Sequence, residues 1–249
     1  MVLSVSIPLM KRSLLLIAIV MLSCLAAPVS NAQQASTPDD GGVSNGVYSN
    51  KFFGFSVTYP KDWVVHGDAT NIRLKELGKE RATTTGAMSA ASSEIVLKNT
   101  YQLLTTFQYP MGAPNVEVNP SFMLVAENVS HAPGIVNGRD YLLHVRPMMI
   151  KTGVVPVQDE PTELLLSGRK FFRQDSRMQV NGMAIQQAII ITVSNGYGLA
   201  FILSGQDQQT IDALAKAVGT LEFVPSPTTA PAKAQGKLSK KKAAPGHRP

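Results

Sequence analysis

The sequence predicts an α+β fold in which a central antiparallel sheet is flanked by helices. The pair Asn195-Gly196 separates two apolar runs, which is a strong signal for a β-hairpin and therefore for antiparallel strands. The run Ile189–Ile191 is apolar at consecutive positions, so this strand is expected to be covered on both faces. Closer to the C-terminus, apolar residues recur at helical spacing and predict an amphipathic helix that packs on the sheet.

The first half of the predicted domain begins with a strand over residues 52–59, in which aromatic and β-branched residues alternate before Pro60. Trp63 follows in a turn that is expected to direct its ring towards the core. Two helical patterns follow at 69–82 and 87–98, with Gly78 and Gly86 as interruptions. Two strand patterns come next, at 101–110 and 122–129.

The second half begins with a helix that is predicted to start at Asn137, with Pro147 expected to kink it or to mark a break. Three strands are then expected, at 162–172, 183–193 and 198–204. A helix at 207–218 places four apolar residues on one face, and Gly219 fits its C-terminal cap; these residues are Ile211, Leu214, Ala215 and Val218. A short strand at 221–224 closes the domain.

The N-terminal 32 residues have the layout of a secretory signal peptide. Lys11 and Arg12 precede an apolar run that is too short to cross a bilayer core of about 30 Å as a helix. Small residues before Gln33 favour cleavage after Ala32. Met10 is an alternative start, because it leaves a more compact basic tip than Met1. The mature chain is therefore expected to be exported from a bacterial cell, as a periplasmic or secreted protein.

Cys24 allows a competing interpretation of the same segment. The residues around it loosely resemble a bacterial lipobox, in which the cysteine is lipidated and becomes the first mature residue. Leu22 matches that pattern poorly, so soluble release is favoured over a lipoprotein. The chain has a single cysteine, so no intrachain disulfide is available to stabilise the domain.

The predicted domain covers residues 47–224 and lies between two polar segments. Residues 33–46 are rich in Gly, Ser, Asp and Asn and predict a flexible linker. Residues 225–249 form a basic Pro/Ala/Lys tail that is expected to be disordered. Eight of the 23 Lys and Arg residues lie in the leader or the tail, but none of the 17 Asp and Glu residues does. The linker and domain together, residues 33–224, hold 15 Lys and Arg against 17 Asp and Glu and are slightly acidic, which argues against nucleic-acid binding.

The cluster Lys240, Lys241 and Lys242 is the most basic part of the tail. It either keeps the chain soluble or attaches it electrostatically to anionic lipid, to a cell-wall polymer or to an acidic partner. A membrane contact is expected only through this tail or through lipidation at Cys24.

Motifs at the two ends of the domain resemble a known family. The stretch from Phe53 through Tyr59-Pro60 to Trp63 resembles the opening strand and turn of PsbP-like domains. The run 198–205, the helix after it and Leu221-Glu222-Phe223 look like the end of the same fold. The resemblance implies an α/β/α sandwich and a role in protein binding or assembly without catalysis. It transfers no functional residues, because the matching positions are core and turn residues.

Candidate catalytic groups are few. Asp140 and His144 are one helical turn apart, and a structural surface pair is favoured over a general base or metal ligand. The other histidines are His66, His131 and His247, and none of the four forms a HExxH motif or a comparable close pair. Asn128 begins a short glycosylation sequon, and Asp159-Glu160 is expected to be a solvated turn.

One string resembles a motif of penicillin-recognising enzymes. Ser167 and Lys170 have S-x-x-K spacing, and Lys151-Thr152-Gly153 matches their K-T-G. The order is reversed, however, and the pair is predicted to lie in a strand, where the two side chains would point to opposite faces. A catalytic role is therefore not expected.

These observations predict an exported, non-enzymatic binding or assembly factor of the bacterial envelope, with an unknown envelope protein or polymer as its partner. No cofactor, metal or catalytic residue is expected. The alternatives are a hydrolase whose catalytic groups come from separate strands, and an extracytoplasmic module that binds a small ligand.

Overall fold

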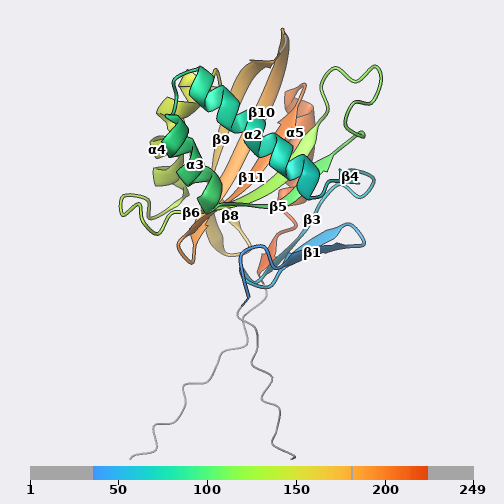
Figure 1. The fold of residues 1–249 in the computed structure, drawn as a ribbon. Coiled ribbons are helices and arrows are strands. Elements are labelled where there is room, and N and C mark those ends of the chain that lie inside the picture. The colour runs from blue at the N-terminus through green and yellow to red at the C-terminus, as the bar shows by residue number, and fades with distance from the viewer. Residues whose placement is uncertain (1–35, 181, 224–249) are drawn as a thin grey trace, which may run out of the picture. The chain divides into compact units, whose positions relative to one another are not determined.

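The computed structural model describes residues 36–180 and 182–223, which form an α+β sandwich (Figure 1). All strand pairs in its two sheets are antiparallel. The eight-stranded sheet has the order β4 (Val64–Val65), β5 (Thr100–Phe107), β6 (Ser121–Asn128), β11 (Tyr197–Gly205), β10 (Met183–Ser194), β9 (Arg169–Val180) and β7 (Val155–Pro156), with β8 (Thr162–Leu166) also on β9. The four-stranded sheet has the order β1 (Gly41–Ser44), β2 (Val47–Asn50), β3 (Phe55–Thr58) and β12 (Glu222–Phe223).

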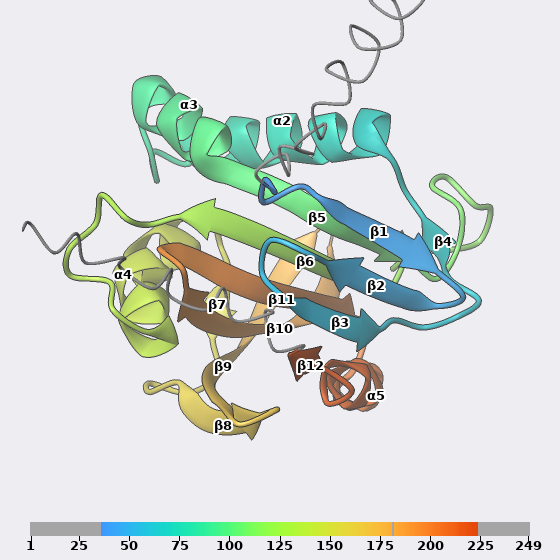
Figure 2. The ribbon, with the colours of Figure 1, turned by 90° about the horizontal axis from the view of Figure 1, so that it is seen from below.

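The helices lie on opposite faces of the large sheet. α2 (Asp68–Thr84), α3 (Ala90–Asn99) and α4 (Gly138–Lys151) cover one face, and α5 (Gln208–Val218) and the small sheet cover the other (Figures 1 and 2). This arrangement confirms the predicted fold class, in which helices flank an antiparallel sheet.

The β10–β11 hairpin and α5 confirm the clearest sequence signals. Asn195 and Gly196 have φ angles of 53° and 77°, the left-handed values that a tight two-residue hairpin turn requires. In α5, Ile211, Leu214 and Val218 are buried as the helical spacing predicts. Asp207 caps the N-terminus of this helix, because its side chain accepts a hydrogen bond from the Thr210 amide.

The prediction that residues 33–46 form a flexible linker is wrong for the last part of this segment. Residues 41–44 form β1, which pairs with β2 across a turn at Asn45-Gly46. Both turn residues have positive φ, so the Asn-Gly pair makes the same kind of hairpin as the one at residue 195. The polar composition of this segment concealed the signal, because a short strand at the edge of a sheet buries few side chains.

Two further strand predictions require correction. The strand predicted at 52–59 begins only at Phe55, because Asn50 accepts a hydrogen bond from the Phe53 amide and holds residues 51–54 in a turn. The strand predicted at 162–172 is a hairpin of β8 and β9, whose turn contains Ser167 and Gly168, both at positive φ. β9 then continues to Val180 through residues whose polar character gave no strand signal.

The predicted helices differ from the structure at two positions. Gly78 does not interrupt α2, and α4 runs through Pro147 to Lys151. As predicted, Asn137 caps α4 by accepting a hydrogen bond from the Asp140 amide.

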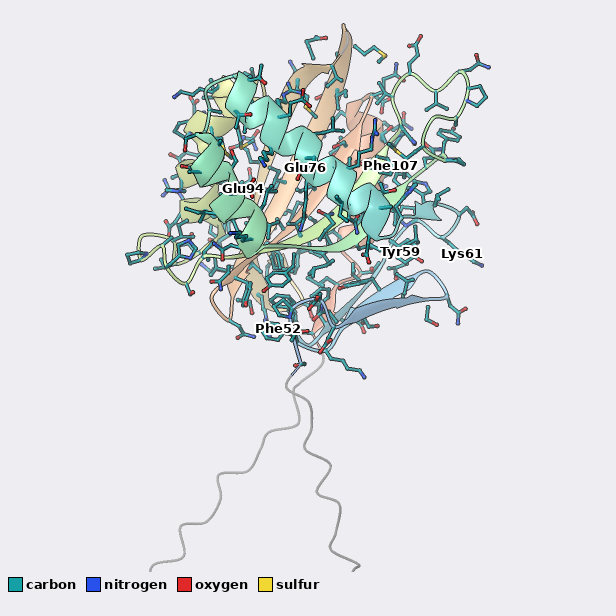
Figure 3. The ribbon with its side chains drawn as sticks, viewed as in Figure 1. Phe52, Tyr59, Lys61, Glu76, Glu94 and Phe107 are labelled. Atoms are coloured by element: carbon teal, nitrogen blue, oxygen red, sulfur yellow. The ribbon has the colours of Figure 1, made fainter. Side chains whose placement is uncertain are left out.

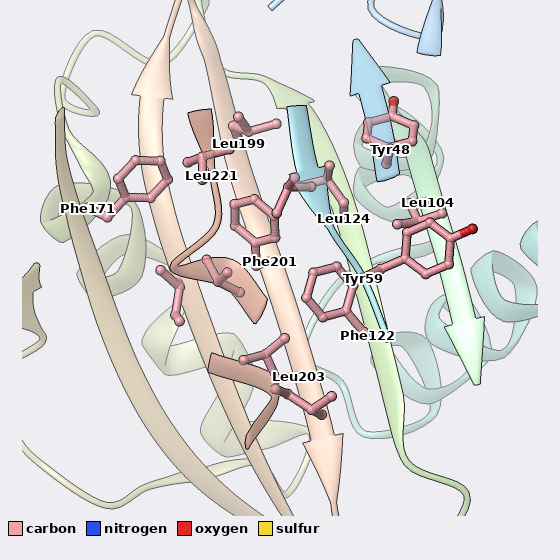
Figure 4. Packing of buried hydrophobic residues seen from close by; sticks show 14 of the residues in the cluster. Tyr48, Tyr59, Leu104, Phe122, Leu124, Phe171, Leu199, Phe201, Leu203 and Leu221 are labelled. Atoms are coloured by element: carbon pink, nitrogen blue, oxygen red, sulfur yellow. The ribbon is translucent and has the colours of Figure 1, made fainter. Parts of the chain in front are cut away.

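The main core lies between the large sheet and the layer formed by α5 and the small sheet (Figure 4). Its central side chains from β6 and β11 are fully enclosed: Leu124, Leu199, Phe201 and Leu203 are each 0% exposed. Phe201 packs against Phe122 and Phe171, with ring centroids 5.9 and 6.4 Å away. Trp63 is partly buried and packs against this core, as the turn at Pro60 predicts.

Candidate functional site

The side of the large sheet that faces α2, α3 and α4 is built differently from the main core. In a strand, alternate residues point to opposite faces, so pairing in register places residues from neighbouring strands in rows across each face. On the helix-facing side, one row is apolar and contains Ile189, Ile202 and Met123 from β10, β11 and β6. All three are partly exposed, whereas Ile190 and Phe201, their chain neighbours on the opposite face, are at most 1% exposed.

The next row on the same side is polar. Ser176, Gln187, Ser204 and Ser121 pair in register across β9, β10, β11 and β6. Gln187 Nε2 donates a hydrogen bond to Ser204 Oγ over 3.3 Å. Ser176 is 1% exposed, and its Oγ has no hydrogen-bond partner within the described part of the chain. Four hydroxyl or amide side chains therefore replace the apolar residues that usually fill the centre of a helix-covered sheet.

α4 closes one end of this side of the sheet. A Cβ at Gly138 would lie 2.3 Å from the Ile191 carbonyl oxygen, so only glycine permits this approach of the helix to β10. Leu142 packs in a small cluster with Phe172, Ile191 and Ala200. This second core is much smaller than the first.

A tyrosine and a carboxylate fix α4 to β6. The Tyr141 hydroxyl donates a hydrogen bond to Glu127 Oε2 over 2.5 Å. Burial raises the pKa of the Tyr141 hydroxyl well above its ordinary value, and the adjacent Glu127 charge raises it further. Tyr141 therefore stays protonated at neutral pH and remains a donor. The sequence gives no signal for this pair, because Tyr141 reads as one more apolar residue of the helix.

α2 contacts its surroundings mainly through polar groups. Asn71 Oδ1 accepts a hydrogen bond from Thr105 Oγ1 of β5 over 2.7 Å. The Lys75 ammonium donates to the Thr100 carbonyl, and Arg81 Nε donates to the Thr152 carbonyl just after α4. Ala82 is the one fully buried residue that this helix contributes. The helix is held in place by its long polar side chains and makes little apolar contact with the sheet.

Three large apolar side chains of α2 and α3 are exposed to solvent. Ile72 and Leu77 of α2 are 62% and 48% exposed, and Ile95 of α3 is 58% exposed. The two helices lie side by side over the sheet (Figures 1 and 2) and are joined by an ion pair between Lys79 and Glu94, the latter labelled in Figure 3. We call the outer side of these two helices, marked by the exposed Ile72, Leu77 and Ile95, the α2–α3 ridge.

Asp140 and His144 both lie on α4, but no hydrogen bond or ion pair joins them, so the predicted surface pair is not formed. The Asp140 carboxylate accepts a hydrogen bond from the Val136 amide and so belongs to the start of α4, and His144 is exposed. His131 is also exposed, and His66 Nδ1 lies 3.3 Å from Thr70 Oγ1. Among the described residues, no group of three or more His, Cys, Asp or Glu side chains is arranged to hold a metal ion.

Ser167 and Lys170 lie in different environments, although the reason given from the sequence was wrong. Ser167 is in a turn and not in a strand, and its Oγ accepts a hydrogen bond from the Phe223 amide. The Lys170 ammonium pairs with Glu163 on β8. Both groups hold the β8–β9 hairpin and its neighbour β12.

The remaining candidates have local partners or lie outside the described residues. Asn128 Oδ1 accepts hydrogen bonds from the Ser130 amide and hydroxyl. Asp159 and Glu160 are exposed, as predicted for a solvated turn, and form surface ion pairs with Arg146 and Arg139 of α4. Cys24 and the cluster Lys240, Lys241 and Lys242 lie outside the described residues.

No protein-family model matches the chain, and no curated protein matches it. A comparison with solved structures finds PsbP from the cyanobacterium Synechocystis, with 11% identity over 78% of this chain and 96% of that one, at a TM-score of 0.44. The chain is similar in fold to PsbP.

Two further solved structures are also similar. LpqN, which is involved in cell envelope biogenesis of Mycobacterium tuberculosis, is 14% identical over 69% of this chain and 83% of its own, at a TM-score of 0.38. A protein of unknown function from Pseudomonas aeruginosa is 16% identical over 52% and 83%, at a TM-score of 0.36. These similarities concern the fold and not the activity. In the described part of the chain, no helix is both long and apolar enough to span a membrane.

Proposed function

We propose that this chain is an exported, non-enzymatic protein of the bacterial envelope that binds a protein partner through the α2–α3 ridge. The observation that carries the proposal is the exposure of two large apolar side chains on α2. Its polar residues Asn71, Lys75 and Arg81 contact the rest of the domain, while Ile72 and Leu77 face solvent. A surface helix normally turns its apolar residues towards the core, so apolar residues on the outer side favour a binding surface.

The chemistry around the ridge supports binding over catalysis. Tyr141 and Glu127 bind each other, and Lys75 and Arg81 bind backbone carbonyl groups. These groups join helices to strands, which is a structural role. Export is supported by the basic and apolar layout of residues 1–32.

The proposal is tested by affinity capture from the native envelope with the mature chain as bait. The test variant carries Ile72→Gln and Ile95→Gln. The matched control carries Val136→Gln and Leu165→Gln, which are 71% and 72% exposed but lie away from both helices. We expect wild type and control to retain the same partner, and the ridge variant to lose it.

Equal retention by the ridge variant would contradict the proposed surface. Recovery of no partner by wild type, together with measurable turnover on a panel of hydrolase substrates, would replace the proposal with the enzyme alternative. Circular dichroism of each variant confirms that the fold is intact before the comparison is made.

A further inference from the structure

Four asparagines of this chain are each followed by glycine: Asn45, Asn137, Asn181 and Asn195. Asparagine before glycine is chemically labile, because glycine has no side chain to hinder attack of its backbone nitrogen on the asparagine amide. Asn181 lies outside the described residues, and the structure places the other three in different surroundings. Those surroundings predict which of the three is modified in the folded protein.

The modification is deamidation through a cyclic imide. The glycine backbone nitrogen bonds to the asparagine Cγ, the bond from Cγ to the side-chain nitrogen breaks, and ammonia leaves with the proton of the glycine amide. Water then opens the ring at either carbonyl and gives aspartate or isoaspartate. In a left-handed residue ψ is about +47°, which places Cβ and the next nitrogen on opposite sides of the Cα–C bond. A left-handed Asn-Gly turn must therefore open before the ring can close.

Asn45 and Asn195 form a matched pair in sequence and in local geometry. Each follows a serine and is exposed, and their φ angles are 51° and 53°. In both turns the carbonyl of the following glycine accepts a backbone hydrogen bond, from the Tyr59 amide over 3.0 Å and from the Val129 amide over 2.9 Å. The two turns therefore differ mainly in the strands that hold them.

The strands beside Asn45 are held much less firmly than those beside Asn195. β1 is four residues long, all of them exposed, and it forms a free edge of the small sheet (Figure 2). β10 and β11 are twelve and nine residues long, and each is also paired with a second strand of the large sheet. Their Ile190 and Phe201 are at most 1% exposed. Exposed edge segments open more often than core strands, so the turn at Asn45 opens more often.

Asn137 is protected by its role at the start of α4. Its Oδ1 accepts a hydrogen bond from the Asp140 amide over 3.1 Å, which caps the helix. Gly138 is buried, and a Cβ there would lie 2.3 Å from the Ile191 carbonyl oxygen. Ring closure would break the cap and move the backbone in a place that has no free space.

We propose that Asn45 is a site of spontaneous deamidation in the folded protein, and that the isoaspartate formed there separates β1 from β2. Isoaspartate continues the chain through its side-chain carbon, so it lengthens the turn by one backbone atom and adds a negative charge. The two-residue turn sets the register of both strands, so a longer turn no longer fits β1 onto β2. This modification does not involve the α2–α3 ridge and goes beyond the proposed binding of a protein partner.

The test follows deamidation at each site in the purified mature protein, incubated in mildly alkaline buffer and analysed by peptide mapping with mass spectrometry. The same chain unfolded in guanidinium chloride gives the reference rate of each site. Opening is fast relative to deamidation, so the ratio of the folded to the unfolded rate reports the open population. We expect this ratio to be at least about tenfold larger at Asn45 than at Asn195, and smallest at Asn137. Equal ratios at Asn45 and Asn195, or a larger ratio at Asn137 than at Asn45, would overturn the proposal.

Two variants test the effect on β1. Asn45→Gly removes the reactive amide and keeps a residue that accepts positive φ, and Asn195→Gly is the matched control in the other hairpin. After incubation, wild type and Asn195→Gly are expected to lose hydrogen-exchange protection at Ser44 and Val47, the pair next to the turn, in proportion to the isoaspartate formed. Asn45→Gly is expected to keep it. Equal loss in Asn45→Gly would show that β1 separates for another reason and would contradict the second part of the proposal.

Discussion

The two faces of the large sheet are made by the same strands, yet they differ in almost every property. On the α5 side, Leu124, Leu199 and Phe201 are fully buried and belong to one continuous core. On the helix-facing side, Met123 and Ile202 from the same strands are partly exposed, and the next row is polar. Alternate residues of one strand thus differ in burial: one face forms the main core, and the other is partly open to solvent.

The helices show the same contrast. α5 buries Ile211, Leu214 and Val218 against the sheet, as an amphipathic helix should. α2 is longer but contributes only Ala82 to the buried residues, and it exposes Ile72 and Leu77. The comparison teaches that the length of a helix says little about its share of the core. The following predictions test whether the two faces differ in energy as they differ in packing.

The largest expected effect is on the sealed face. Phe201→Ala removes a ring that is 0% exposed and should lower the free energy of unfolding by about 3–5 kcal/mol. Met123→Ala, one strand away on the open face, should lower it by about 1–2 kcal/mol, because that side chain is already partly exposed. Urea denaturation followed by Trp63 fluorescence measures both. Similar losses in the two variants would show that the faces do not differ.

A smaller loss is expected where α4 touches the sheet. Gly138→Ala places a Cβ about 2.3 Å from the Ile191 carbonyl oxygen, so the helix must move, at about 1–3 kcal/mol. Gly134→Ala is the control, because a Cβ there meets no atom within 4 Å. Its stability should change by less than about 0.5 kcal/mol. If Gly138→Ala were as stable as the control, α4 would not be fixed at this distance.

Tyr141→Phe should lower stability by about 1–3 kcal/mol at neutral pH, because Glu127 loses its hydrogen-bond donor in a partly buried position. Thermal unfolding with the double variant Tyr141→Phe, Glu127→Gln shows how much of the loss is coupling between the two groups. Additive losses in the double variant would argue against a direct bond.

The same tyrosine gives a pH dependence of known sign. Its pKa is raised in the folded state, so the folded protein holds this proton more tightly than the unfolded chain does. The stability contribution is therefore complete below about pH 10, the ordinary value, and is lost as the pH rises above it. As the pH rises above about 10, wild type should lose stability more steeply than Tyr141→Phe. Parallel curves would contradict the assignment.

The smallest expected effect is that of Ser176→Ala. The hydroxyl has no partner in the described residues, so its removal should leave the free energy of unfolding within about 0.5 kcal/mol of wild type or slightly above it. Chemical denaturation measures this directly. A loss of more than about 1 kcal/mol would show that the hydroxyl has a structural partner.

The sequence predicted the elements that carry strong local signals. The β10–β11 hairpin follows from Asn195-Gly196, and α5 follows from the spacing of its apolar residues. β1 and the second half of β9 were missed, because strands at an edge or with polar side chains lack apolar alternation. The turn at Ser167-Gly168 was missed because it lies within a run that is otherwise continuous in strand propensity.

The candidate site was not predictable in the same way. Ser176, Gln187, Ser204 and Ser121 become neighbours only through the register of four strands. A single polar residue in a strand usually indicates a solvent-facing position, and the sequence does not show which face a helix covers. The α2–α3 ridge was missed for a related reason, since exposed and buried apolar residues in a helix look alike in a sequence.

The central contrast in this molecule is that one face of the large sheet is open to solvent and the other is sealed from it. Isoleucine methyl NMR with a soluble nitroxide tests this directly, because isoleucines lie on both faces. We predict that the probe broadens the methyl signals of Ile189 and Ile202 and leaves those of Ile190 and Ile211 unchanged. If Ile189 and Ile202 were as protected as Ile190, the helix-facing side would be closed, and the central claim would be wrong.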